Sequence, residues 1–137
     1  MANTVCTTFK SELLKGDHDF SSDTFKIALY TSSATSLADY TVYAVTNEAS
    51  GTGYSAGGIA LSGGTVALSG TTAYADFTDA AYTSVTITAR YALIYNTSES
   101  NKACFFLDFG GNKTATNGTF TIVFPAAGAS AVLTLTG

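Results

Sequence analysis

The sequence is poor in charged residues. Asp, Glu, Lys and Arg make up 12% of its 137 residues, whereas about 25% is usual in globular domains. The few cations are spread along the whole chain, and a phosphate-binding face would need them clustered. They are Lys10, Lys15, Lys26, Arg90, Lys102 and Lys113. Together with a net charge of −4, this distribution predicts no nucleic-acid partner.

Long apolar runs are missing as well. No stretch approaches the roughly 20 apolar residues that span a bilayer, so no membrane partner is expected. Residues 1–6 have neither the basic start nor the apolar centre of a secretory signal, which predicts a protein that folds in a cytoplasm. In that compartment the two cysteines, Cys6 and Cys104, are more often buried free thiols than a disulfide.

Histidine is almost absent, because His18 is the only one in the chain. One histidine cannot build a His-rich zinc site. His18 lies between Asp17 and Asp19, and adjacent side chains point in different directions, so we expect a solvated turn. A calcium site on Asp17, Asp19 and Asp23 lacks the Gly and the final Glu of a calcium-binding loop. The pattern therefore predicts no bound metal.

The other signals for chemistry are weak. Residues 51–58 are rich in Gly but lack the Lys-Ser/Thr that follows in a phosphate-binding P-loop, so we expect an exposed loop. Asp76, Asp79 and Asp108 could supply an acid pair for glycoside hydrolysis, although any ten acidic residues offer some pair. The sequence therefore predicts a protein that is not an enzyme and uses no cofactor.

Instead of charged residues the sequence is rich in Thr and Ser and contains 13 Gly and 8 Tyr. This composition favours strands and turns. Residues 84–95 alternate most clearly, with Val85, Ile87 and Ala89 on one face. Similar short segments occur at about 24–30, 57–61, 65–69, 72–77, 103–109, 119–124 and 131–136, with a weaker one at 41–45. No helical crossovers separate them, as a parallel sheet would need. About eight short strands indicate an all-β antiparallel sandwich over 24–136, in a single domain.

One segment has the period of a helix. Val5, Phe9 and Leu13 recur at every fourth residue. Gly16 stands where such a helix would end. The spacing predicts a helix over residues 5–15. Because a helix this short is marginal alone, its apolar stripe is expected either to cover one end of the sandwich or to meet a partner chain.

The expected strand 103–109 is apolar on both faces, with Phe105 on one and Phe106 on the other. An outward Phe needs a cover. Either the helix 5–15 or the loop 31–56 provides it, or this face joins another subunit, because exposed apolar patches mark contacts. Tyrosines of the loop add to the candidates, since Tyr is enriched at interfaces. The candidate subunit or partner contacts are Val5, Phe9, Leu13, Tyr40, Tyr43, Tyr54, Cys104 and Phe106.

Several segments of fold and turn residues have a distinctive sequence. They are 24–35 (TFKIALYTSSAT), 47–48 (NE), 50–54 (SGTGY), 56–58 (AGG), 87–90 (ITAR), 94–96 (IYN), 101–103 (NKA), 107–110 (LDFG), 116–122 (TNGTFTI) and 124–125 (FP). Together they extend over nearly the whole chain and resemble a family of small virion proteins of tailed bacteriophages. Members of this family look like capsid cement, or decoration, proteins.

The resemblance implies a jelly-roll-like sandwich with no catalytic, cofactor-binding or metal-binding residues. It also implies a protein made in the host cytoplasm that binds the capsid exterior and bridges neighbouring major capsid proteins. Its partners would be the major capsid protein and, in a homodimer, a second copy of itself. The alternative is a tail- or head-fibre-associated module that binds a receptor or carbohydrate, because jelly rolls also serve as lectins. Its ligand surface would be the loop 31–56 with Tyr40, Tyr43 and Tyr54.

Overall fold

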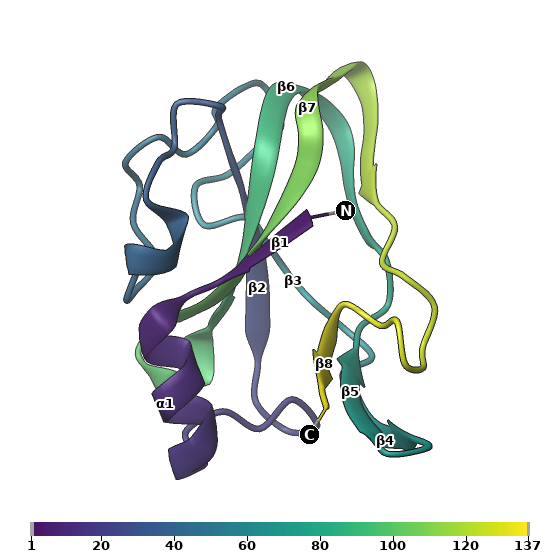
Figure 1. Cartoon of the computed structure of the whole chain (residues 1–137). Helices are drawn as coiled ribbons and strands as arrows, with labels where there is room; N and C mark the ends of the chain where they lie inside the picture. The colour runs from purple at the N-terminus through teal and green to yellow at the C-terminus, as the bar shows by residue number, and fades with distance from the viewer. Residues whose placement is uncertain (1, 137) are drawn as a thin grey trace.

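The structure, a computed structural model that describes residues 2–136, consists mostly of antiparallel strands (Figure 1). The elements are β1 (Ala2–Val5), α1 (Thr7–Lys15), β2 (Phe25–Tyr30), η1 (Leu37–Asp39), β3 (Ile59–Ala60), β4 (Thr65–Ser69), β5 (Thr72–Asp76), β6 (Ala80–Asn96), η2 (Thr97–Glu99), β7 (Lys102–Ile122) and β8 (Leu133–Leu135). The expected all-β antiparallel sandwich of about eight strands with a short N-terminal helix is confirmed.

Two sheets form the sandwich. The larger has the strand order β1-β7-β6-β2-β3, and the smaller has the order β4-β5-β8. An aromatic cluster joins them: Phe20 stacks on Phe25 of β2 with 4.5 Å between ring centroids, and Phe77, which follows β5, contacts both. Phe9 of α1 extends this cluster, because its ring lies 6.0 Å from that of Phe20. The core therefore lies between the large sheet on one side and α1 with the small sheet on the other.

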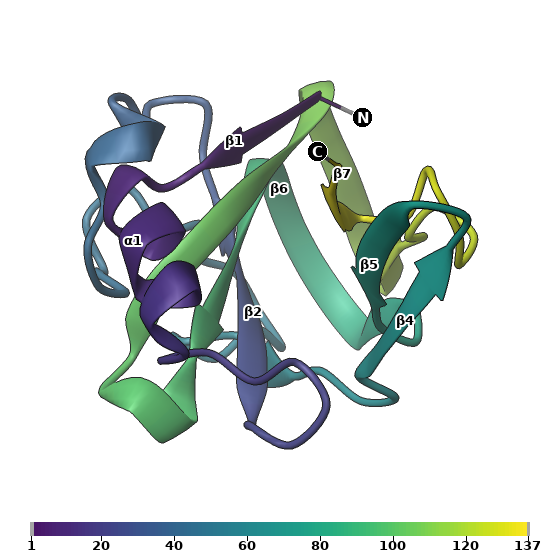
Figure 2. The ribbon, with the colours of Figure 1, turned by 60° about the horizontal axis from the view of Figure 1, so that its bottom comes forward.

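β6 and β7 form one long hairpin that runs through the large sheet, as Figure 2 shows. The segments 103–109 and 119–124 were expected as separate strands, but β7 is continuous over 21 residues and contains all of the first and residues 119–122 of the second. The β6–β7 register shifts at four places. Such bulges bend a strand pair, which lets a single hairpin curve along its length.

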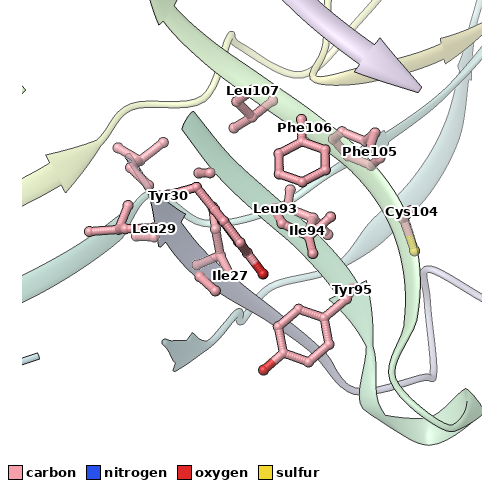
Figure 3. Close-up of a cluster of buried hydrophobic side chains, with 14 of the residues drawn as sticks. Ile27, Leu29, Tyr30, Leu93, Ile94, Tyr95, Cys104, Phe105, Phe106 and Leu107 are labelled. Atoms are coloured by element: carbon pink, nitrogen blue, oxygen red, sulfur yellow. The ribbon is translucent and has the colours of Figure 1, made fainter. Parts of the chain in front are cut away.

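Apart from Phe9 of α1, the largest fully buried side chains lie on the central strands β2, β6 and β7 (Figure 3). Ile27, Leu93 and Phe105 are completely shielded from solvent. Burial of each such side chain contributes roughly 1.5–3 kcal/mol of hydrophobic free energy. Neighbouring residues on these strands are buried as well, so both faces of the central sheet are covered.

The helix is shorter than the expected 5–15 because the first residues join the sheet. β1 pairs with β7, and Val5 lies opposite Phe105, so Val5 belongs to a strand. In the pair with β7, main-chain groups of β1 form hydrogen bonds between strands. At the free end of a helix the same groups would lack partners. The predicted end is confirmed: Gly16 has a φ of 82°, and its N–H donates to carbonyls of the last helical turn.

The loop 31–56 covers the second face of the large sheet. The ring of Tyr40 lies 4.9 Å from that of Phe106, and Tyr30 contacts the same ring at 5.4 Å. The outward side of Phe106 is therefore covered within the chain. The weak strand expected at 41–45 is reduced to an isolated bridge in this loop, between Val42 and Lys102.

Cys104 does not share a face with Phe106, in contrast to the expected alternation. Between Ile94 and Tyr95 the pairing with β7 shifts, and Cys104 is left as the extra residue of a bulge. A bulge re-aims the side chain of its extra residue. The Sγ atom of Cys104 consequently lies 3.8 Å from Nδ1 of His18, beneath α1 rather than beneath the loop.

Candidate binding surface

His18 is buried and hydrogen-bonded, which corrects the expected solvated turn. Its Nε2 lies 3.0 Å from Oε1 of Glu12, and its Nδ1 accepts from Nδ2 of Asn96 at 3.0 Å. Because Nδ1 accepts, the proton of a neutral ring is on Nε2 and points at Glu12. The ring also contacts Phe9, with 4.9 Å between centroids. These contacts satisfy the polar atoms of His18 and fasten α1 to the end of β6.

Cys104, His18 and Glu12 form a row of thiol, imidazole and carboxylate, an arrangement that activates nucleophiles in many enzymes. Here the thiol of Cys104 is completely buried, and this burial raises its pKa well above the ordinary range. Burial also raises the pKa of Cys6 to about 12. A reactive cysteine needs access and a lowered pKa. The row is therefore explained by packing beneath α1.

The acidic residues considered for chemistry have separate roles. Asp79 accepts from the N–H of Phe124 at 2.9 Å. Asp108 pairs with Arg90 at 3.1 Å, and the hydrogen bond from this guanidinium lowers the pKa of Asp108. Within residues 2–136, no three His, Cys, Asp or Glu side chains form a group able to hold a metal ion.

Glu48 organises the loop 31–56. Its two carboxylate oxygens accept from the hydroxyls of Tyr43 (2.5 Å) and Tyr54 (2.6 Å), and the N–H of Gly57 donates to it at 2.8 Å. Burial raises the pKa values of Tyr43 and Tyr54, and the hydrogen bonds to Glu48 raise them further. Both phenols therefore already have hydrogen-bond partners within the chain. This argues against a carbohydrate site that depends on their hydroxyls.

The Gly-rich segment 51–58 lies flat on the sheet. A Cβ atom at Gly51 would overlap the carbonyl oxygen of Thr86, and one at Gly58 would overlap that of Ile27. Gly58 also has a φ of 75°, which disfavours other residues. The N–H of Thr86 donates to the carbonyl of residue 52 at 2.9 Å. The glycines therefore permit close main-chain contact with β2 and β6.

A markedly apolar groove of about 440 Å³ lies between the end of α1 and the small sheet. Leu13, Phe20 and the polar residues His18 and Asp19 line one side of it, and β4, β5 and β8 line the other. The lining residues of the sheet are Val66, Ala73, Tyr74, Ala75, Leu133, Thr134 and Leu135. A hollow of similar volume, about 460 Å³, follows the bend of β7, but Lys113 and several Thr side chains make it more polar.

The strand register explains why the groove is apolar. Leu68 of β4, Ala73 of β5 and Leu135 of β8 are direct neighbours across the small sheet. Val66 lies two residues before Leu68 and therefore on the same face. The exposed fractions of Val66, Leu68 and Leu135 are 54%, 74% and 61%. This face thus continues past the core into solvent as an apolar surface.

The structure corrects part of the candidate contact set. Phe9, Cys104 and Phe106 have exposed fractions of 1%, 0% and 0%, so they cannot meet another protein while the chain is folded. The reason is that α1 and the loop 31–56 cover both faces of β7. Leu13 does line the apolar groove. The remaining candidates are partly buried against the core: Val5, Tyr40, Tyr43 and Tyr54.

Sequence reasoning missed the apolar face of the small sheet. Its strands are short, and alternation alone does not say whether a second layer covers them. One signal was present: no Asp, Glu, Lys, Arg or His occurs in residues 49–75 or 114–137. These two uncharged stretches contain β4, nearly all of β5, and β8.

No protein-family model matches the chain, and no curated protein or solved structure matches it either. None of the helices in residues 2–136 has the length and apolar character needed to cross a membrane. Function is therefore inferred from the surface of the folded chain and from the resemblance of its sequence.

Proposed function

We propose that the chain is a bacteriophage capsid cement protein, which binds the capsid exterior, bridges neighbouring major capsid proteins and stabilises the shell. The observation that carries this proposal is the mainly apolar groove between α1 and the small sheet, in which Asp19 is the one carboxylate among the lining residues. The sequence resemblance to tailed-phage virion proteins supplies the partner. The chain would be made in the host cytoplasm and function on the virion.

The groove suits a protein contact better than a small-molecule site. Exposed apolar patches mark protein contacts, and here apolar side chains from β4 and β8 project beyond the groove itself. β4 and β8 contribute no charged side chain, so the sheet side of the contact can be buried without the cost of desolvating a charge. The one carboxylate that lines the groove, that of Asp19, lies on the other side. A cement protein binds a shell at many equivalent places, so a bivalent unit holds firmly even when each contact is weak.

The test uses capsids that lack the protein. Purified chain is mixed with such capsids, and co-sedimentation and the melting temperature of the shell are measured. We expect saturable binding and a higher melting temperature. If the chain does not co-sediment and the shell melts as before, the proposal is wrong.

A matched pair of variants locates the contact. Leu135→Glu places a carboxylate in the groove and should weaken capsid binding at least about tenfold, because a charge there would lose its hydration. Leu14→Glu is the control: Leu14 is 85% exposed and does not line the groove, so binding should be unchanged. Equal effects of the two substitutions would contradict a contact in the groove.

A further inference from the structure

β4 is an edge strand that nothing in the described chain extends. It hydrogen-bonds to β5 on one side and ends the small sheet on the other. Four of its five residues are exposed. Of the four strands that end the two sheets, β4 is the longest, since β1 has four residues, β8 three and β3 two. It therefore offers the longest row of unpaired main-chain groups at a sheet edge.

The β4 edge also lacks the usual protection against pairing. Edge strands are commonly guarded by a charged residue, a proline or a bulge. Thr65–Ser69 contains no charge and no proline, and its pairing with β5 runs without a register shift. Two of its side chains, Val66 and Leu68, are exposed and apolar.

The sequence of β4 is complementary to itself. In antiparallel pairing centred on Ala67, Val66 of one copy lies opposite Leu68 of the other, and Thr65 lies opposite Ser69. The apolar residues of both copies then share one face, as a stable register requires. Val and Leu in direct cross-strand contact are stabilising.

Electrostatics favour the same partner. Each copy carries a net charge of −4, so two copies repel each other over most of their surfaces. β4 itself is uncharged, because residues 49–75 contain no Asp, Glu, Lys, Arg or His, and in its ladder with β5 the one charged residue is Asp76, opposite Thr65. A neutral, self-complementary edge is where two like-charged copies can meet at least cost.

We infer that β4 binds β4 of a second copy, which makes an isologous dimer with one continuous six-stranded sheet. In a two-fold arrangement the same patch is used by both copies. Val66 and Leu68 of each copy then lie beside those of the other on one face of the sheet. Two apolar grooves lie on the same sheet, one from each copy. On the proposed function, this pair of grooves is what lets one dimer bridge two capsid proteins.

The test is a charge swap at the centre of the predicted register. Ala67 is exposed and lies on the opposite face of the sheet from Val66 and Leu68, and its two copies would lie opposite each other across the two-fold axis. Light scattering after gel filtration should give twice the chain mass for the wild type. Ala67→Lys alone and Ala67→Asp alone should be monomers at the same concentration. An equimolar mixture of the two variants should form dimers again, because opposite charges then face each other.

The matched control is Thr134→Lys. Ala67 and Thr134 both pair with Tyr74, on its two sides, so they occupy one cross-strand row on the same face but at opposite edges of the sheet. This variant should remain a dimer. A cooperative thermal transition should show that every variant is folded. A wild type that is monomeric up to millimolar concentration would overturn the inference. So would Ala67→Lys remaining a dimer, or Thr134→Lys dissociating the dimer equally.

The dimer and the proposed function can fail separately. Leu135→Glu should abolish capsid binding but leave the dimer intact, since Leu135 is on β8. A dimer that never binds capsids would refute the cement function only. Capsid binding by a wild-type monomer would refute the β4 pairing only.

Discussion

Replacing Glu48 with Gln should destabilise the loop 31–56 more than any other single isosteric change in it. Glu48 accepts three hydrogen bonds, from Tyr43, Tyr54 and Gly57. Glutamine has the same shape but offers one acceptor oxygen in place of two, and no charge. The N–H₂ group of the amide cannot accept from a phenol, so at least one of the three bonds is lost.

The size of the effect follows from these bonds. A hydrogen bond to a charged group contributes about 1.5–3 kcal/mol, whereas a neutral one contributes about 1 kcal/mol. Tyr43 is partly exposed, so its hydroxyl can turn to water. With one hydrogen bond lost and two weakened, the free energy of unfolding should fall by about 2–3 kcal/mol. For a chain of this length each kcal/mol lowers the melting temperature by about 4 °C. We therefore expect a fall of about 8–12 °C.

Calorimetry measures the loss of stability, and amide hydrogen exchange locates it. The N–H of Ala49 donates to the Leu29 carbonyl at 2.8 Å, so its exchange should accelerate in Glu48→Gln. The N–H of Ile94, within the central sheet, should exchange only as global stability falls. Asp39→Asn is the control, because Asp39 is exposed and lies outside the Glu48 hydrogen bonds. A melting temperature within about 2 °C of the wild type, with unchanged exchange at Ala49, would refute the reasoning.

Three further outcomes are expected. Phe106→Ala should cost about 3–5 kcal/mol of stability, measured by urea unfolding, because this ring is core; a stable variant that only loses partner binding would contradict this. The lowered pKa of Asp108 beside Arg90 means that its ion pair stabilises the fold above the unfolded pKa of about 3.9. The stability difference between wild type and Asp108→Asn should therefore vanish as the pH falls through the lowered folded pKa, and a constant difference would argue against the pair. Cys6 and Cys104 should react with a thiol reagent only after unfolding, and rapid labelling of the native chain would show that they are not buried.

The class of the fold was predictable from the sequence because alternation is a local property. Side chains of a strand point to opposite faces in turn, so residues such as Val85 and Ile87 already show which positions share a face. Gly16 likewise marks the helix end through its own backbone freedom. Neither feature depends on what lies across the molecule, and both are seen in the structure.

The position of the first residues was not predictable in this way. Val5 continues the helical spacing of Phe9 and Leu13, yet it belongs to β1, which pairs with β7 about a hundred residues away in sequence. Hydrogen bonds between strands so distant in the chain leave no periodic trace in the sequence of either strand. His18 is a similar case, because Asn96 and Glu12 satisfy its ring nitrogens only in the folded chain.

What the sequence determined by itself is the composition of the strands that form most of the candidate surface, because the stretches 49–75 and 114–137 contain no charged residue. Only the tertiary structure decided where those stretches meet. It buried Phe106 under the loop 31–56 and left Val66, Leu68 and Leu135 in solvent. The physical reason is that exposure depends on which layer packs over a side chain, and in this protein α1 and the small sheet meet along a groove that neither of them fills.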